Sequence, residues 1–204
     1  MIVFFILGYV LSAKVKDSKE NSGERLVIQI IHEAFPREKY HLLNNVTLST
    51  SDGGTTQIDH ILVSKYGIFV IETKDYSGWI FGSKSSKKWT QSFPARKYQF
   101  QNPLHQNHKH IHELVKLFDF MPKSAFKSLV VFTNKSQFKT RKPENVIYIN
   151  QLKNYIYSFQ AEEISQNRVF FVVGKIEVLR REVSEQTDQL HVEYLKNKFI
   201  PQDV

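Results

Sequence analysis

Two short segments of this chain place acidic and basic side chains beside apolar stretches. Asp59 lies within residues 56–60, and Glu72 and Lys74 follow the apolar residues 68–71. Carboxylate oxygens are the ligands that Mg²⁺ prefers, and a nearby lysine can position water or stabilise a developing negative charge. These residue types and their spacing predict a site that binds a divalent metal ion beside a scissile phosphate.

The two segments are predicted to be consecutive β-strands. Residues 57–63 and 68–74 are rich in β-branched and aromatic side chains. Residues 64–67 form a short turn between them, in which Gly67 can adopt a positive φ. The continuous apolar run at the start of the second strand is typical of a buried central strand.

The register of this strand pair decides which side chains meet. If Val63 pairs with Ile68, Asp59 lies opposite Glu72 because side chains alternate between the two faces. A three-residue loop would instead oppose Glu72 with His60 and turn Asp59 to the other face. On the first register, one face carries the polar side chains of Gln57, Asp59, Glu72 and Lys74.

A series of short motifs extends from residue 23 to about residue 118. It comprises Gly23-Glu24, Gln57-Ile58-Asp59-His60, Gly67-Ile68-Phe69-Val70-Ile71-Glu72-Thr73-Lys74, Gly78, Trp89 and Asn102-Pro103-Leu104-His105-Gln106. In order and spacing, these motifs resemble the NERD (nuclease-related) domain family of the restriction-endonuclease-like, PD-(D/E)xK superfamily. Ile58 stands where the superfamily motif has proline, a position that is not a metal ligand.

The resemblance implies roles for particular side chains. Asp59 and Glu72 would bind the metal, and Lys74 would orient the attacking water or stabilise charge on the phosphate. The implied cofactor is Mg²⁺, with Mn²⁺ as the alternative. Three further residues would assist, the first as an auxiliary ligand and the others as positioners of phosphate or water: Glu24, Gln57 and Gln106.

Ordinary structural roles are the alternatives. Glu72 and Lys74 could form an ion pair on an exposed strand, although the apolar run before them argues for burial. Glu24 could be a first-turn acid favoured by the helix dipole. Asn102 could cap a helix that begins with Pro103. Gln106 would then be an ordinary residue of this helix.

The charge of the chain favours an anionic partner. The formal net charge is +8, which suits nucleic acid. Basic residues interleave with Trp79, Trp89, Phe93 and Tyr98, so they could follow a phosphate backbone beside stacking rings. For the two tryptophans we expect packing against the sheet instead. The basic residues expected to contact nucleic acid are Lys84, Lys87, Lys88, Arg96 and Lys97.

Two other features restrict the function. The chain has no cysteine, which excludes disulfides, thiolate zinc sites and a cysteine nucleophile. His105, His108 and His112 share a helix face, and His110 lies among them, but no carboxylate is clearly placed beside them. We therefore expect a polar helix face near the nucleic acid rather than a second metal site.

The N-terminus is unusually apolar. Residues 2–11 lack charge and are followed by Lys14, Lys16 and Lys19. This stretch is shorter than the ~20 residues of a membrane span and lacks the basic start of a signal peptide. We expect a cytoplasmic protein. There are three alternatives: tethering to the inner face of the membrane by residues 2–11, packing of this stretch as a helix or strand, or an artefact of the choice of start site.

Hydrophobic periodicity predicts the remaining elements. They are a helix ending near Phe35, a strand at 40–49, a small hairpin of 79–82 and 88–91, a helix at 102–118, strands at 128–133 and 146–149, a helical stretch at 151–160, a strand or helix at 169–173, and a polar helix at 182–199. The resemblance supplies the topology: a restriction-endonuclease-like core of helix, three strands, helix and strand. The fold class is therefore α/β, an α+β mixed sheet with a C-terminal, mostly helical extension.

The expected organisation is an apolar segment at 1–17, a nuclease-like domain at 18–150 and an extension at 151–204 packed on or following it. The expected function is that of a metal-dependent nuclease hydrolysing phosphodiester bonds, with DNA favoured over RNA by family analogy. The alternative is a catalytically weak nucleic-acid-binding module, or a membrane-tethered interaction module, that retains the nuclease fold.

Overall fold

A five-stranded sheet carries both strands of the predicted site. The computed structural model describes residues 22–182 and 184–199. The sheet has the order β1-β2-β3-β7-β9, with β1, β2 and β3 antiparallel and with β7 and β9 parallel to β3. Its strands are β1 (His41–Ser49), β2 (Thr55–Ser64), β3 (Gly67–Lys74), β7 (Phe126–Phe132) and β9 (Val146–Tyr148).

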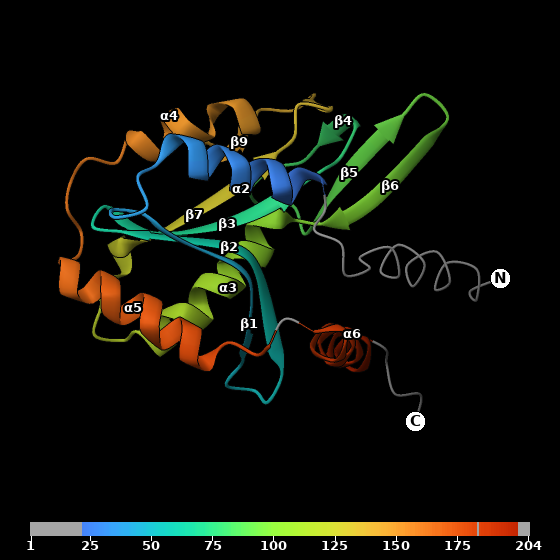
Figure 1. The fold of residues 1–204 in the computed structure, drawn as a ribbon. Helices are drawn as coiled ribbons and strands as arrows, with labels where there is room; N and C mark the ends of the chain where they lie inside the picture. Colours follow the sequence, from blue (N-terminus) through green and yellow to red (C-terminus); the bar gives the residue numbers. More distant parts are fainter. Residues whose placement is uncertain (1–21, 183, 200–204) are drawn as a thin grey trace.

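Helices cover both faces of this sheet (Figure 1). On one face, α2 (Ser22–Ala34) and α4 (Leu152–Tyr157) bury apolar side chains in a cluster that includes Ile71 of β3. On the other face, α3 (Pro103–Leu117) and α5 (Gln166–Leu179) pack in a cluster that includes Val70. Because β3 is covered on both sides, its continuous apolar run is explained by burial rather than by alternation.

The predicted element order is confirmed. α2, β1 to β3, α3 and β7 follow one another as helix, three strands, helix and strand, with additional strands inserted before α3. Beyond residue 150 the described elements are helical, and α6 (Glu185–Phe199) ends this extension. Residues 169–173 are helical because Ser165 caps α5 and because Val169, Val172 and Ile176 form its buried stripe.

A second sheet of four strands has the order β6-β5-β4-β8. β4 (Gly78–Phe81) pairs with β5 (Lys88–Phe93) as the predicted hairpin, but β6 (Arg96–Gln101) and β8 (Ser136–Phe138) widen it. Trp89 is fully buried and stacks on Phe132, whereas Trp79 is 44% exposed. The expected packing of both tryptophans on the sheet is therefore wrong for Trp79.

The β2–β3 hairpin has the predicted register. Its paired residues are Ser64–Gly67, Val63–Ile68, Leu62–Phe69, Ile61–Val70 and His60–Ile71. Gly67, at the start of β3, has the positive φ expected from the sequence, 144°, which glycine adopts without steric cost. Since the ladder ends at His60, Asp59 and Glu72 occupy the next positions on the same register, and the alternative that pairs Glu72 with His60 is wrong.

The N-terminus of α3 is capped as expected from the sequence. The side chain of Asn102 accepts a hydrogen bond from the backbone N–H of Leu104 at 3.0 Å, and Pro103 occupies the first turn. The side chain of Asn102 also donates to backbone carbonyls of residues 83–86. This asparagine therefore ties the β4–β5 loop to the start of α3.

A buried asparagine in the middle of α3 fixes the helix against the sheet. Nδ2 of Asn107 donates to the carbonyls of Val70 and Leu129 at 2.8 and 3.2 Å, and to Oγ of Ser128 at 3.0 Å. These acceptors belong to β3 and β7, so the bonds set the position of α3 over both strands.

We expect Asn107→Ala to lower the free energy of unfolding by about 1–3 kcal/mol, because buried acceptors lose their donor. Urea unfolding would measure the change. Asn154→Ala, at an exposed position on α4, is the control and should change stability by less than about 0.5 kcal/mol. Equal losses in the two variants would contradict the anchoring role.

No helix in the described part of the chain is long and apolar enough to cross a bilayer. The apolar residues 2–11, considered above as an anchor, lie outside the described residues.

Candidate active site

Glu72 and Lys74 form an ion pair inside the protein. Nζ of Lys74 donates to Oε1 of Glu72 at 2.5 Å. Glu72 is 0% exposed, and β3 is buried from Gly67 to Thr73. The alternative of an ion pair on an exposed strand is therefore wrong. Both side chains lie on one face of β3, because they alternate with Thr73. This is the face that α3 covers, since Gln106 contacts Lys74 and His110 lies beside Glu72.

Asp59 reaches β3 from the neighbouring strand. Its Oδ2 accepts the backbone N–H of Thr73 at 2.8 Å, and the residue is 3% exposed. Thr73 separates Glu72 from Lys74 in the sequence. The Asp59 carboxylate is therefore held against the backbone of the segment that carries the ion pair, and its convergence with Glu72 on one metal ion stays a prediction.

Two side chains of α3 complete the surroundings of the pair. Oε1 of Gln106 accepts a hydrogen bond from Nζ of Lys74 at 3.2 Å. Nε2 of His110 lies 3.4 Å from Oε2 of Glu72. The other ring nitrogen of His110, Nδ1, lies 2.6 Å from Oγ1 of Thr56 on β2. Gln106, predicted only as a positioner of phosphate or water, thus contacts the ion pair directly.

The sequence reasoning missed His110 and Thr56. The three histidines grouped by helical spacing were His105, His108 and His112, and His108 and His112 are exposed. The signal that could have identified His110 is its position four residues after Gln106, because residues four apart share a helix face.

The electrostatics of the cluster favour a charged lysine. Burial penalises the ammonium, but the Glu72 carboxylate, with Tyr76 and Asp59, raises the pKa of Lys74 above its ordinary value. Lys74 is therefore a hydrogen-bond donor at neutral pH rather than a base. Burial lowers the pKa of His60 to about 4 despite the nearby carboxylates, so this imidazole is neutral at neutral pH.

The two remaining predicted residues lie on α2 and β2. Glu24 is buried in the first turn of α2, and Gln57 is half-buried on β2. A Cβ at Gly23 would lie 2.9 Å from Cβ of Asp75 and 3.1 Å from Cγ2 of Thr133, so α2 begins against the ends of β3 and β7. Within the described residues, no group of three or more His, Cys, Asp or Glu forms a metal-binding cluster. Glu24 as a third ligand therefore stays a prediction, as does the role of Gln57.

Asp75 fastens the start of α2 to the strand ends beside the site. Its carboxylate accepts hydrogen bonds from Ser22, from Oγ1 of Thr133 at 2.7 Å and from Nζ of Lys135 at 2.9 Å. Burial opposes the charge, but these hydrogen bonds hold the pKa of Asp75 below its ordinary value of 3.8.

We expect Asp75→Asn to cost about 1–3 kcal/mol at neutral pH, because charge-assisted hydrogen bonds are lost. A carboxyl group whose pKa is lower in the folded than in the unfolded protein stabilises the fold at pH values above the unfolded pKa. This stabilisation disappears as the pH falls through the folded pKa. The difference between wild type and variant should therefore shrink below about pH 3.8. Thermal unfolding across pH would measure it, with the exposed Asp119→Asn as control. A difference independent of pH would contradict this assignment.

The five predicted nucleic-acid-binding residues are exposed and lie on the second sheet or its β4–β5 loop: Lys84, Lys87, Lys88, Arg96 and Lys97. The loop that carries Lys84 is joined to α3 by Asn102 and by His105, whose Nε2 is 3.2 Å from the Lys84 carbonyl. Gln106 follows directly on the same helix. The lysine loop therefore adjoins the helix that covers the ion pair, and its contact with nucleic acid stays a prediction.

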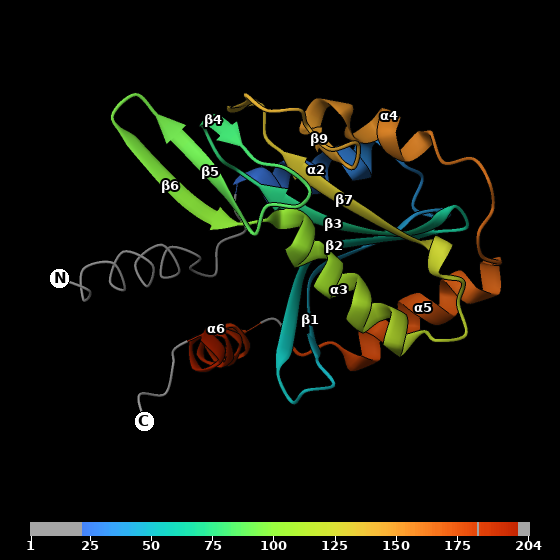
Figure 2. The ribbon, with the colours of Figure 1, turned by 180° about the vertical axis from the view of Figure 1, so that it is seen from behind.

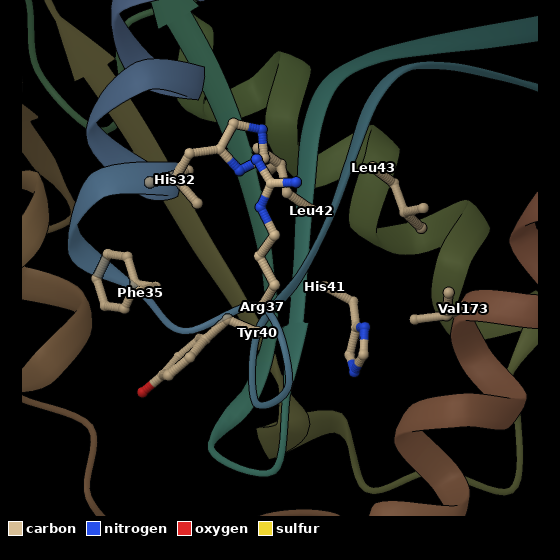
Figure 3. A pocket seen from close by; sticks show the side chains of 9 residues that line it. His32, Phe35, Arg37, Tyr40, His41, Leu42, Leu43 and Val173 are labelled. Atoms are coloured by element: carbon tan, nitrogen blue, oxygen red, sulfur yellow. The ribbon is translucent and has the colours of Figure 1, made fainter.

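A cavity of about 280 Å³ lies elsewhere, among α2, β1 and α5 (Figure 3). Its lining includes His32, Arg37, Tyr40 and His41. None of the predicted catalytic residues lines it. The candidate site is therefore the buried cluster on β2, β3 and α3 and not this cavity.

Comparisons with known proteins bear on the same region. The sequence profile of the nuclease-related domain family, NERD, matches residues 19–133. An uncharacterised protein of Bacillus anthracis is 36% identical over 211 residues, an alignment that covers 98% of this chain and 94% of that protein. The family match includes every residue of the cluster, whereas α4, α5 and α6 follow it.

Proposed function

Because this chain belongs to the nuclease-related domain family, we propose that it is a metal-dependent nuclease that hydrolyses phosphodiester bonds in DNA. The observation that carries the proposal is the buried Glu72–Lys74 pair, with Asp59 on the adjacent strand and Gln106 above it. A carboxylate pair beside a protonated lysine suits phosphoryl chemistry, in which positioning and charge stabilisation dominate.

The residues present fit a hard divalent cation. Asp59 and Glu72 are both buried, and Lys74 supplies one positive charge against their two formal negative charges. Mg²⁺ is commonly held by one or two carboxylates, with water and substrate phosphate as its other ligands. The pair therefore suffices without a third protein ligand. When bound, the metal would neutralise phosphate charge and lower the pKa of a bound water.

The protein side chains have separable roles in this proposal. Lys74, which keeps its proton, donates to the attacking water or to a phosphate oxygen. Gln106 and Glu72 fix the direction of its ammonium by accepting its hydrogen bonds. His110 acts through Glu72, as a positioning residue braced by Thr56 on β2.

The choice of DNA rests on family analogy and on charge. The exposed basic residues of the second sheet and its loop lie next to α3, where they can contact phosphates on either side of the scissile bond. Phosphate contacts position a substrate without selecting its sequence. RNA is the alternative polymer, and the cleavage test includes it.

The test is cleavage of plasmid DNA, linear duplex, single-stranded DNA and RNA by the purified chain with Mg²⁺ or Mn²⁺. We expect cleavage of DNA with either metal and none in EDTA, since the metal supplies charge neutralisation that the side chains cannot replace. Restoration by added Mg²⁺ would exclude damage by the chelator. Binding of DNA without cleavage under every metal condition would contradict the proposal and favour a binding module that retains the fold.

A further inference from the structure

The outer face of the second sheet carries two exposed aromatic rings. Trp79 and Phe81 are 44% and 38% exposed, and they flank Ile80, which is fully buried. Alternation along β4 therefore places both rings on the same outward face. β4 is an internal strand between β5 and β8, so the rings lie near the middle of the sheet and not at its edge.

The inner face of the same sheet is packed and immobilises this surface. Ile80 and Trp89 belong to one buried cluster with Phe132 of β7. The rings of Trp89 and Phe132 lie 6.1 Å apart with an interplanar angle of 15°. The two tryptophans therefore have opposite roles, since Trp89 anchors the sheet and Trp79 faces solvent. β5 and β6 project beyond the central sheet in both views (Figures 1 and 2).

Two lysines share the outward face with these rings. Nζ of Lys139 lies 5.1 Å from the centre of the Trp79 ring. Lys97 pairs with Ser92, which pairs in turn with Trp79, and residues paired across neighbouring strands share a face. The chain has no Asp or Glu between residues 76 and 112 or between residues 120 and 143, and these ranges include all four strands of the sheet. Exposed rings on a sheet whose strands carry no carboxylate suit a polyanion that has flat apolar groups.

We propose that this face binds a single-stranded segment of nucleic acid, with bases stacked on Trp79 and Phe81 and phosphates paired with Lys97 and Lys139. The proposal rests on the nuclease function and names its substrate class: nucleic acid with unpaired nucleotides. Aromatic side chains on the face of a four-stranded sheet are an effective platform for unpaired bases.

The spacing of the rings selects a single strand over a duplex. Side chains two residues apart on a strand are separated by about 7 Å, whereas bases in a duplex rise by about 3.4 Å per nucleotide. Two such rings can each meet a base only where successive bases are unstacked. In a duplex, each base face is covered by its neighbour.

The experiment measures binding of oligothymidylate and of a duplex in EDTA, which prevents cleavage. Trp79→Ala and Phe81→Ala should each weaken binding of the single strand by about 5- to 100-fold, as expected for loss of one stacked base, and leave duplex affinity within about twofold. Phe170→Ala is the control, since this ring is also exposed but lies on α5. Unchanged affinity for the single strand, or equal losses for both ligands, would overturn the proposal.

Tryptophan fluorescence supplies an independent readout. Stacking on Trp79 should quench the emission of the wild type, and Trp79→Phe should retain most of the affinity but lose the quenching, because the remaining Trp89 is fully buried. Quenching that persists in Trp79→Phe would contradict the stacking assignment. Capture of a protein or peptide by this face, with no affinity for oligothymidylate, would also overturn it.

The experiments distinguish failure of the nuclease proposal from failure of the single-strand binding proposal. If the wild type cleaves no nucleic acid but binds oligothymidylate through Trp79, the hydrolysis fails and the platform stands. If it cleaves DNA while Trp79→Ala leaves single-strand binding unchanged, the platform fails and the nuclease stands.

Discussion

Replacing Glu72 by glutamine is expected to reduce DNA cleavage by at least about 100-fold, the usual cost of losing one group that stabilises charge in a transition state. The substitution keeps the size of the side chain but removes the negative charge proposed to hold the metal. It also replaces the charged acceptor of Nζ of Lys74 by a neutral amide oxygen. Cleavage rates under single-turnover conditions would measure the loss, because they isolate the chemical step.

A matched control is available on the surface. Glu162 pairs with Lys65 at 2.7 Å, but the side chains of Lys65 and Glu162 are 37% and 57% exposed. Glu162→Gln should leave cleavage unchanged. Binding of DNA in EDTA should be similar for wild type and Glu72→Gln, since the exposed basic residues remain. Equal cleavage by wild type and Glu72→Gln would assign the activity to another site or to a contaminant.

Replacing Lys74 by methionine is expected to destabilise the protein by about 3–5 kcal/mol, because it leaves the Glu72 carboxylate buried without its counter-ion. The double variant Glu72→Gln/Lys74→Met should recover much of this loss, since it removes both charges. Urea unfolding in EDTA would give the interaction energy from a double-mutant cycle, free of any metal contribution. Both variants should lack cleavage, which separates the stability of the pair from its chemistry.

The exposed Lys65–Glu162 pair again provides the comparison. Lys65→Met should cost less than about 1 kcal/mol, because solvent screens the pair and the separated charges remain hydrated. If Lys74→Met cost no more than Lys65→Met, or if the double variant showed only additive losses, the pair would not be coupled in the way that its burial implies.

The two proposals together assign hydrolysis and substrate binding to different parts of the protein. β3 and its neighbour β2 carry the groups proposed for hydrolysis, and the second sheet presents the surface proposed for unpaired bases. Asn102 joins them, because it caps α3 and holds the β4–β5 loop through three backbone carbonyls. A nuclease built this way would select substrates by strandedness through a surface separate from its chemistry.

The tertiary features that escaped the sequence reasoning share a cause. β8 has only three residues and pairs with β4, which lies more than 50 positions earlier in the chain. Neither hydrophobic periodicity nor a turn motif therefore predicts this strand. β6 reads as a polar segment in the sequence, because four of its six residues are Arg, Lys or Gln. The opposite burial of Trp79 and Trp89 follows from which face of this sheet meets β7, and local spacing does not encode that contact.

The sequence by itself determined that residues 57–63 and 68–74 form consecutive strands, since their composition and the turn between them are local features. It left two registers open, and the structure decided for the one with a two-residue loop at Lys65 and Tyr66, in which alternation places Asp59, Glu72 and Lys74 on one face. Only the tertiary structure decided that His110 and Gln106 close over this face, because their approach depends on how α3 docks through Asn107 onto strands distant in the chain.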